Sequence, residues 1–235
     1  MSILLERGQR GIIIGQTGSG KTVGAIVQLQ STHLFPVIIF DTKGEPAFDS
    51  IALDDEESIV YDSAADFLKN WPKKSQPDYI IVRPDMHELS DIEALDGVLQ
   101  AIMHIGKKCL IYIDEAYQFH IQGRAGAGLV GLLTRGRSKG MSVLMSTQRP
   151  AWLSRFCFTE AQKFYIYRLT DERDHKIISA YIPGFLQKSV AKKHHFYYYD
   201  NSQDESGIKY FKPVQILTKS IDPNKGVVEK KRHWI

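Results

Sequence analysis

The sequence predicts an α/β domain with a mainly parallel central sheet flanked by helices and a β-hairpin near the C-terminus. Short apolar runs that suit buried parallel strands alternate with segments whose apolar residues recur at helical spacing. The chain has 235 residues, of which 43% are hydrophobic, and this is enough for one full core. We therefore expect a single domain over residues 1–218, followed by a polar, basic tail over residues 219–235.

A glycine-rich loop separates the first predicted strand, residues 12–14, from a predicted helix over residues 23–29. It matches the phosphate-binding pattern G-x-x-x-x-G-K-[ST] through Gly15, Gln16, Thr17, Gly18, Ser19, Gly20, Lys21 and Thr22, with Val23 next in the helix. Glycines let backbone N–H groups converge on a phosphate, and the positive end of the helix dipole favours the same anion. Lys21 is expected to reach the β- and γ-phosphates, and the Thr22 hydroxyl to bind magnesium. The flanking strand and helix disfavour the alternative of an ordinary glycine turn.

A polar run, residues 41–45, follows the second predicted strand, residues 37–40. Such residues at the carboxyl end of a buried strand can face a ligand, although a solvated loop explains them equally well. The next expected elements are a solvated acidic turn at 54–57, a short helix at 64–71 and a third strand at 79–82. A helix over residues 90–105 follows, with Ser90 and Glu93 as its capping box.

An acidic pair, Asp114 and Glu115, ends the fourth predicted strand, residues 110–113. Apolar residues followed by Asp-Glu have the form of the second nucleotide-binding motif of P-loop ATPases. Asp114 would hold magnesium opposite Thr22, and Glu115 would accept a proton from an attacking water. The pattern alone is weak evidence. It gains weight because it follows the phosphate-binding loop with strands and helices alternating in between.

Two arginines and a glutamine surround the fifth predicted strand, residues 143–145. Arg135 and Arg137 come after a short helix at 129–134, and Gln148 comes after the strand. Arginines at a helix end often cap carbonyls or face water, and a glutamine beyond a strand is often only a turn residue. Here all three accompany a predicted triphosphate site. A glycine-rich stretch, residues 122–128, precedes the helix and is expected to be a mobile loop.

The C-terminal third predicts a sixth strand at 163–167, a helix that begins near 171–174, and an antiparallel hairpin formed by 194–199 and 208–211. His194 and His195 are adjacent in the chain, so on a strand they point to opposite faces and make a poor metal pair.

Charge and cysteine content narrow the function classes. The formal net charge of +3 permits nucleic-acid binding without indicating it. The only cysteines, Cys109 and Cys157, lie in apolar runs, which favours buried thiols in a reducing compartment over a disulfide or a metal site. No apolar run approaches the roughly 20 residues that span a bilayer, and we expect a soluble intracellular protein.

The order of these parts resembles the FtsK–HerA superfamily of P-loop ATPases, which pump DNA. The resemblance rests on GQTGSGKT, IYIDEA, TRGRSKGMSVLMSTQRP and FYIYRLTDERD, and it covers about residues 8–180. The third piece is the most specific, because a strand ending in T-Q-R-P just after an arginine and a glycine is typical of these motors. The small size is similar to that of the genome-packaging ATPases of membrane-containing double-stranded DNA viruses.

This resemblance implies a RecA/FtsK-like fold, the cofactors ATP and Mg²⁺, and roles for individual residues. The matching positions are Lys21 and Thr22 for phosphate and magnesium, Asp114 for magnesium, Glu115 for the catalytic base, Gln148 for the polar sensor, and Arg137, with Arg135 in reserve, for the arginine supplied to a neighbour's ATP. It further implies a homo-oligomeric ring, a hexamer in such motors, that threads double-stranded DNA without reading its sequence. Capsid or inner-membrane components of a virion would be its other partners, in the host cytoplasm or at the packaging vertex. The stretch 123–128 with Arg124 is the candidate for the channel-facing loop.

Several alternatives remain at this point. A GTPase or small-molecule kinase could use the same loop, but Val227 stands where a guanine-reading N-K-x-D motif requires aspartate. A morphogenesis ATPase of filamentous phage, resembling the zonula occludens toxin family, would usually carry a membrane anchor. A HerA-like cellular DNA motor shares the same motifs. A non-hydrolysing DNA-binding scaffold would not need Glu115.

Overall fold

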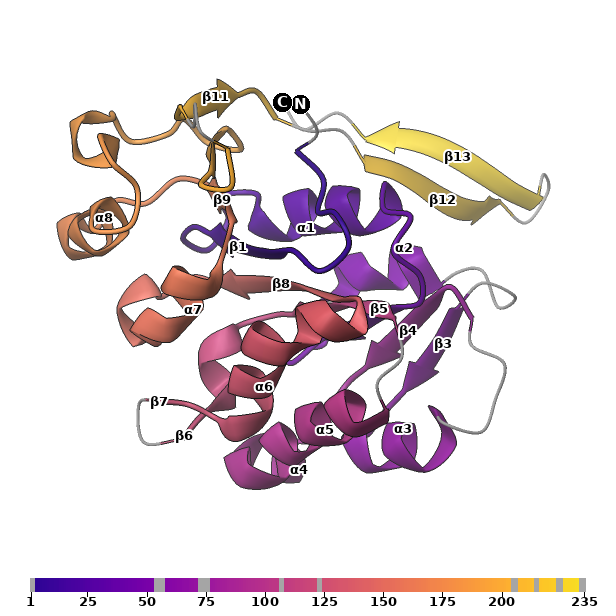
Figure 1. Ribbon diagram of the computed structural model, residues 1–235. Helices are drawn as coiled ribbons and strands as arrows, with labels where there is room; N and C mark the ends of the chain where they lie inside the picture. Colours follow the sequence, from indigo (N-terminus) through magenta and orange to yellow (C-terminus); the bar gives the residue numbers. More distant parts are fainter. Residues whose placement is uncertain are drawn as a thin grey trace.

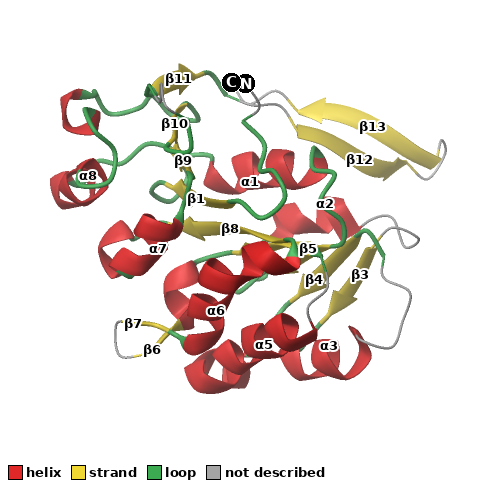
Figure 2. Cartoon of the chain, in the orientation of Figure 1, coloured by secondary structure: helices red, strands yellow, loops and turns green. Residues whose placement is uncertain are grey.

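The protein was analysed as a computed structural model that describes residues 3–52, 58–71, 77–105, 108–121, 124–203, 207–213, 216–222 and 226–232. A nine-stranded sheet forms its centre (Figures 1 and 2). In spatial order the strands are β11 (Lys209–Phe211), β10 (Phe196–Asp200), β9 (Lys163–Ile166), β1 (Arg10–Ile14), β8 (Met141–Thr147), β5 (Cys109–Ile113), β2 (Val37–Phe40), β4 (Tyr79–Val82) and β3 (Ser58–Tyr61). The seven strands from β9 to β3 are parallel, and β10 and β11 add the antiparallel hairpin. This confirms the predicted fold class.

Helices cover both faces of the sheet (Figure 1). They are α1 (Lys21–Gln30), α2 (Asp49–Ala52), α3 (Ala64–Asn70), α4 (Met86–Ser90), α5 (Ile92–Ile105), α6 (Ala127–Arg135), α7 (Arg155–Glu160) and α8 (Glu172–Ser179). Successive side chains of a strand point to opposite faces, so the sheet divides the core into two clusters. One cluster packs α1 and α2 on one face, and the other packs α3, α5, α6, α7 and α8 on the opposite face.

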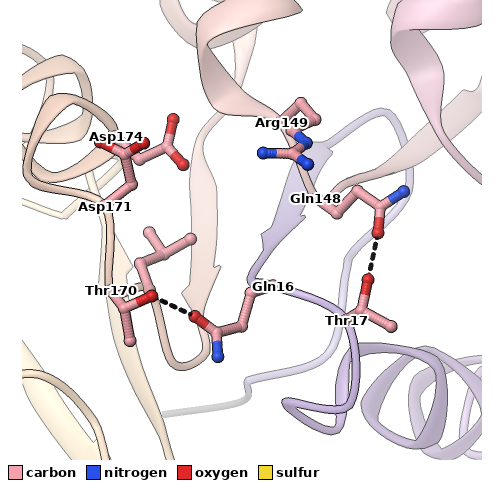
Figure 3. Close-up of a pocket in the computed structure, with 8 residues that line it drawn as sticks. Gln16, Thr17, Gln148, Arg149, Thr170, Asp171 and Asp174 are labelled. Carbon is pink, nitrogen blue, oxygen red and sulfur yellow. Dashed lines mark hydrogen bonds between the residues drawn. The ribbon is translucent and has the colours of Figure 1, made fainter.

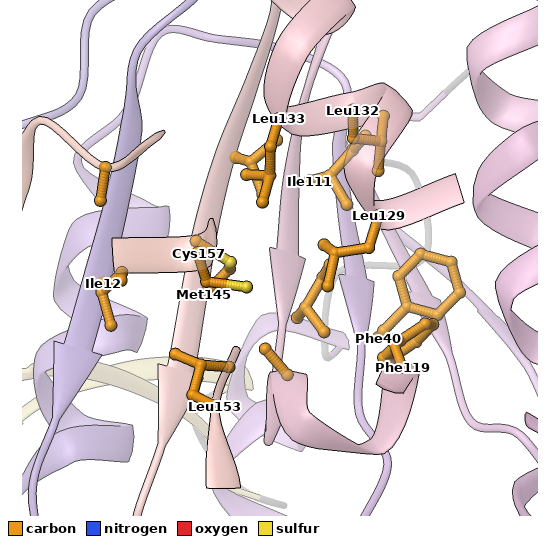
Figure 4. Close-up of a cluster of buried hydrophobic side chains, with 14 of the residues drawn as sticks. Ile12, Phe40, Ile111, Phe119, Leu129, Leu132, Leu133, Met145, Leu153 and Cys157 are labelled. Carbon is orange, nitrogen blue, oxygen red and sulfur yellow. The ribbon is translucent and has the colours of Figure 1, made fainter. Parts of the chain in front are cut away.

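The larger cluster fills the space between the central strands and α6 (Figure 4). Ile111 on β5 and Met145 on β8 are fully buried, as are Leu132 and Leu133 on the helix. Both cysteines are buried free thiols, and loss of hydration raises their pKa values to about 12. This agrees with the expected packing role.

Three details differ from the sequence-based predictions. The helix expected over 90–105 is divided, because Asp91 leaves helical geometry and its side chain accepts a hydrogen bond from Ala94 N at 3.0 Å. The capping box is formed by Asp85 and Glu88 at the start of α4, so the assignment of Ser90 and Glu93 was wrong. β3 was not predicted, because only two of its four residues are buried. The acidic turn expected at 54–57 lies outside the described residues.

Two small antiparallel ribbons lie outside the main sheet. β6 (His120–Ile121) pairs with β7 (Arg124–Ala125), and β12 (Ile216–Asp222) pairs with β13 (Gly226–Arg232). The boundary expected between residues 218 and 219 falls inside β12, which lies against α1 and α2. The division into a domain and a polar tail stays a prediction. Among the described helices, none is both long and apolar enough to cross a membrane.

Candidate functional site

The glycine-rich loop connects β1 to α1 at the carboxyl edge of the parallel sheet, next to the end of β8. Gly15 N donates a hydrogen bond to Thr147 O at 3.3 Å. A Cβ atom at Gly15 would lie 2.6 Å from both Ser19 Oγ and Tyr167 Cβ, so no larger residue fits. Gly20 has a φ of 103°, which side chains rarely tolerate. The loop therefore needs its glycines for close approach and for backbone conformation.

Lys21 begins α1, and the charges of the two acidic residues that follow β5 act on it. It is buried, and burial lowers the pKa of its ammonium group, while Glu115 and Asp114 act in the opposite direction. Thr22 follows in the first turn of the same helix. A buried lysine at a helix N-terminus provides the fixed positive charge that a phosphate group requires.

Asp114 and Glu115 follow β5 and are 5% and 0% exposed. Asp114 Oδ1 accepts a hydrogen bond from the Tyr112 hydroxyl at 3.2 Å, and desolvation raises its pKa. Glu115 has a φ of 53°, an uncommon conformation for a residue with a side chain. Such backbone conformations are found at active sites and ligand-binding sites, where a side chain is held in one direction.

Gln148 connects Glu115 to the glycine-rich loop, and Figure 3 shows its contact with Thr17 of that loop. Its backbone N–H donates to Glu115 Oε2 at 3.1 Å, and its side-chain Oε1 accepts a hydrogen bond from Thr17 Oγ1 at 2.6 Å. The structure thus brings together three positions that the sequence analysis selected on separate motifs. Their catalytic roles stay predictions.

Lys43 belongs to the same site; the sequence analysis placed it in the polar run 41–45, where a ligand-facing role and a solvated loop were equally good explanations, and gave it no individual role. Its Nζ lies 2.5 Å from Glu115 Oε1 and 3.9 Å from Asp114 Oδ2. Burial alone would lower the pKa of Lys43, but the hydrogen bond to Glu115 and the charge of Asp114 outweigh it, and the net pKa is raised. The sequence feature that could have identified Lys43 is its position shortly after a buried strand, β2. In the structure β2 lies next to β5.

A polar pocket of about 310 Å³ opens beside the start of the glycine-rich loop (Figure 3). Its lining residues are Gln16, Thr17, Gln148, Arg149, Leu169, Thr170, Asp171 and Asp174. Thr170 Oγ1 donates to Gln16 Oε1 at 2.9 Å, which ties the loop to the segment after β9. The pocket adjoins the Thr17–Gln148 contact and is open to solvent.

Arg135 and Arg137 lie away from this site. Arg135 ends α6, and Arg137 lies in the 3-10 turn Gly136–Lys139, before the first residue of β8. Gln148, in contrast, follows the last residue of β8. Both arginines are exposed. They therefore project from the edge of the sheet opposite to the glycine-rich loop of their own chain.

The glycine-rich stretch before α6 has a packing role where it is described. Asp96, 1% exposed, accepts hydrogen bonds from Gly128 N at 2.7 Å and from Leu129 N at 3.0 Å. A Cβ atom at Gly126 would lie 2.3 Å from Asp96 Oδ1. Close packing explains both glycines without mobility, because a Cβ atom at Gly128 would lie 2.3 Å from the backbone oxygen of Asp96. Arg124 is exposed on β7, whereas residue 123 lies outside the described residues.

The residues present suit a magnesium ion that arrives with a nucleotide. Asp114 Oδ2 receives no hydrogen bond from the described residues, and the Lys43 ammonium group lies 3.9 Å from it. One carboxylate and one hydroxyl, with phosphate oxygens and water, are the usual ligands of nucleotide-bound Mg²⁺. Within the described ranges no three His, Cys, Asp or Glu side chains are grouped to hold a metal without such help.

Known proteins resemble this chain in sequence and in fold. No family model matches the chain. DNA packaging ATPase P9 of Enterobacteria phage PRD1 is 33% identical over 205 residues, covering 82% of each protein. The genome packaging NTPase B204 of Sulfolobus turreted icosahedral virus 2 matches with a TM-score of 0.68 and 21% identity, over 89% of this chain and 98% of that chain. VirB4 of Thermoanaerobacter pseudethanolicus matches with a TM-score of 0.62 and 12% identity, over 87% and 89%.

The two structural matches establish the fold, and the identity with P9 establishes the family. The predicted recognition is therefore confirmed. This chain belongs to the viral DNA-packaging ATPases, a branch of the FtsK–HerA P-loop ATPases that includes P9 of phage PRD1.

Proposed function

We propose that this protein is an ATP-driven translocase that packages a double-stranded DNA genome, with hydrolysis at the subunit interfaces of a homo-oligomeric ring. The observation that carries the proposal is the set of contacts from Thr17 of the glycine-rich loop through Gln148 to the buried Glu115. These contacts connect a phosphate-binding loop to a candidate base in a chain whose relative P9 is a DNA packaging ATPase. B204, which has the same fold, has been solved with AMPPCP and with ATP-gammaS.

In this proposal each residue has a separate task in ATP hydrolysis. Lys21 and the loop N–H groups hold the β- and γ-phosphates, while Thr22 and Asp114 hold Mg²⁺, which offsets the phosphate charge. Glu115 accepts a proton as water attacks the γ-phosphorus, and the bond to the β,γ-bridging oxygen breaks to give ADP and phosphate. Gln148 orients the water or the γ-phosphate from the end of β8.

A ring of subunits would give a catalytic role to Arg137, which lies too far from the glycine-rich loop of its own chain to act there. Arg137 is exposed at the far edge of the sheet, where it can serve only a neighbouring subunit. A head-to-tail interface closes into a ring when its repeated rotation completes a full turn, and we propose that six subunits do so here. The resulting channel would hold duplex DNA through its phosphates, which is why sequence should not matter. Capsid or inner-membrane proteins are the proposed docking partners, and the host cytoplasm or packaging vertex the location.

Phosphate release with and without duplex DNA tests this function most directly. We expect Mg²⁺-dependent ATPase activity that duplexes of unrelated sequence stimulate equally, and DNA binding that weakens steeply with salt because phosphate contacts release counterions. Glu115→Gln is the matched control, since it keeps the fold and the side-chain size. A chain that turns over GTP but not ATP, or that ignores DNA, would contradict the proposal.

A further inference from the structure

Trp152 is the largest hydrophobic side chain that the described residues expose, with 59% of its surface accessible. It lies just beyond β8, in the 3-10 turn Pro150–Trp152. Its ring meets the Tyr117 ring edge to face with the centroids 5.3 Å apart, and the Arg149 guanidinium lies 5.7 Å from its centroid. The backbone is fixed as well, because Trp152 N donates to Arg149 O at 3.0 Å and the next residue, Leu153, is buried. The indole is thus held in place while most of its surface is exposed.

An exposed tryptophan that is already held in place is suited to a protein interface. Tryptophan is enriched among the few residues that carry most of the binding energy of such interfaces, where it fills a pocket on the partner. A side chain that is ordered before association also loses less conformational entropy when it binds. The partner of Trp152 should therefore offer an apolar groove that accepts a flat ring.

A groove of about 430 Å³ lies between α5 and α6, which pack side by side (Figure 1). Most of the residues around it are apolar or glycine, and polar residues lie at its margin. The lining residues are Gln100, Met103, Ala127, Gly128, Val130, Gly131, Thr134 and Arg135. This groove, called the α5–α6 groove below, has the composition that an indole ring requires.

Gly131, at the centre of α6, has no packing role among the described residues. A Cβ atom there would meet only Met103 Cγ, at an ordinary 3.8 Å, whereas one at Gly128 would lie 2.3 Å from Asp96 O. Glycine inside a helix is less favourable than alanine, because it loses more conformational entropy on folding. A glycine that the chain itself does not need keeps the α5–α6 groove open, which indicates that another molecule binds there.

Trp152 and the α5–α6 groove lie apart in one chain. The groove ends at Arg135, before β8 begins, whereas Trp152 follows the end of β8. The two side chains that hold the indole, Tyr117 and Arg149, do not line the groove. Contact between the two surfaces therefore requires a second chain. Because the surfaces differ, such a contact is head to tail, which is the kind that can close into a ring.

The charges beside the two surfaces are complementary. The turn that carries Trp152 lies against α8, and residues 171–174 at the start of that helix include three acids and one arginine. Arg149 is also on this side, but its charge acts on Asp174. The groove ends instead at three exposed basic residues, Arg135, Arg137 and Lys139. Complementary charges of this kind orient two subunits as they meet and disfavour other orientations.

We propose that Trp152 of one subunit docks in the α5–α6 groove of the next subunit. The inference rests on the proposed function, because it specifies the head-to-tail contact of the proposed ring. Trp152 comes four residues after Gln148, and Arg137 comes two residues after Arg135 at the end of the groove. The docked indole therefore brings the arginines of one subunit to the Gln148 side of its neighbour's site, so that one contact serves both assembly and hydrolysis.

Cross-linking between engineered cysteines tests the docking while Trp152 stays in place. One chain carries Ala151→Cys, and a second chain, made larger by a tag, carries Thr134→Cys; both positions are exposed, whereas the native cysteines are buried. After subunit exchange, a short bismaleimide should join the two chains at least about tenfold more than either variant alone, because docked residues react at the effective concentration of one complex. Met86→Cys, on the exposed surface of α4, is the matched control in place of Thr134→Cys and should stay at background. Adding Trp152→Ala to the Ala151→Cys chain should abolish the product.

The strength of assembly provides an independent readout. In sedimentation velocity over a range of concentrations, Trp152→Ala should raise the dissociation constant between subunits about 30-fold or more, as the loss of an interface anchor implies. Gly131→Leu should have a similar effect because it fills the groove, and its folding is checked by far-ultraviolet circular dichroism. The two changes together should cost little more than either alone, because both remove the same contact. Met86→Ala should leave assembly unchanged.

The possible outcomes separate the docking from the proposed function. Cross-linking at background, or unchanged assembly of both Trp152→Ala and Gly131→Leu, would overturn the inference, and so would a chain that stays monomeric. Weaker binding of DNA by Trp152→Ala with unchanged assembly would assign the indole to nucleic acid instead. If Gly131→Leu does not fold, the cross-linking result decides. Rings that form through this contact but release no phosphate from ATP would support the docking and refute the proposed function.

Discussion

Arg137 offers the strongest test of hydrolysis between subunits. It lies before β8 begins at Met141, whereas Gln148 follows the end of that strand at Thr147. Seven residues of strand span about 20 Å at roughly 3.3 Å per residue, which is more than an arginine side chain can bridge. Arg137 therefore cannot reach the γ-phosphate of its own subunit. If it acts in catalysis, it acts on a neighbour.

Arg137→Ala should bind ATP and assemble, yet hydrolyse about 10³- to 10⁵-fold more slowly, a loss of about 4–7 kcal/mol of transition-state stabilisation. Folding should tolerate the change because the side chain is exposed. Mixing this variant with Glu115→Gln creates interfaces where an intact Glu115 receives an intact Arg137. With random exchange about one interface in four is of this kind, so up to about a quarter of the unmodified rate should return.

The assay is steady-state phosphate release with saturating duplex DNA, on rings whose subunit exchange is verified by fluorescence transfer between labelled chains. Lys139→Ala is the matched control, because Lys139 is exposed and basic in the same 3-10 turn. Normal hydrolysis by Arg137→Ala alone would refute the reasoning. So would the absence of recovery in rings that do exchange subunits, and Arg135 would then be tested in the same way.

Four further predictions concern the site and the core. Lys21→Ala should abolish nucleotide binding or turnover and leave the far-ultraviolet circular dichroism spectrum unchanged; full activity in the folded variant would contradict this. Glu115→Gln should retain Mg-ATP and lose about two to four orders of magnitude in rate; an unchanged rate would place the base elsewhere. Asp96→Ala should lower the free energy of unfolding by about 1–3 kcal/mol in a urea titration, because two buried N–H groups lose their acceptor; an unchanged midpoint would count against this account. Cys109 and Cys157, with pKa values raised to about 12, should be about 10⁻⁴ thiolate at pH 8, against roughly a quarter for a thiol of pKa 8.5. Iodoacetamide should therefore label both at least about a thousandfold more slowly in the folded than in the urea-unfolded chain, and rapid labelling of the folded chain would show that they are accessible.

The sheet was predictable wherever strands are buried on both faces. β2 and β4 have the predicted bounds, and both consist of apolar residues only. β3 was not predicted because its residues are not all apolar and buried: Val60 is 36% exposed, as expected for a strand at the edge of the sheet. The break between α4 and α5 was not predicted for another reason. The Asp91 side chain competes with the backbone for hydrogen bonds. The sequence alone does not decide whether Asp91 or Ser90 caps the helix.

The glycine-rich stretch before α6 shows how packing overrides composition. Three glycines in seven residues suggested mobility, yet Gly126 and Gly128 lie against a buried carboxylate more than 25 residues earlier in the chain. The partner, Asp96, is the polar exception among the buried residues of α5. A buried acid on an amphipathic helix requires donors, and a helix N-terminus supplies them. That contact was not visible until both helices were placed.

The absence of Lys43 from the predicted site has a topological cause. Motifs identify residues by their neighbours in sequence, whereas Lys43 meets Glu115 only because β2 lies beside β5 in the sheet. The register of these two strands also matters. Phe40 pairs with Ile113, so the residues that follow β2 and β5 leave the sheet at the same level and can contact each other. Parallel strands in register place their next polar residues together, and a lysine there faces a carboxylate whatever their separation in sequence. The polar residues that follow one buried strand should therefore be considered together with those that follow the adjacent strand in the sheet. In this chain that comparison identifies Lys43 as the cation that faces the candidate base.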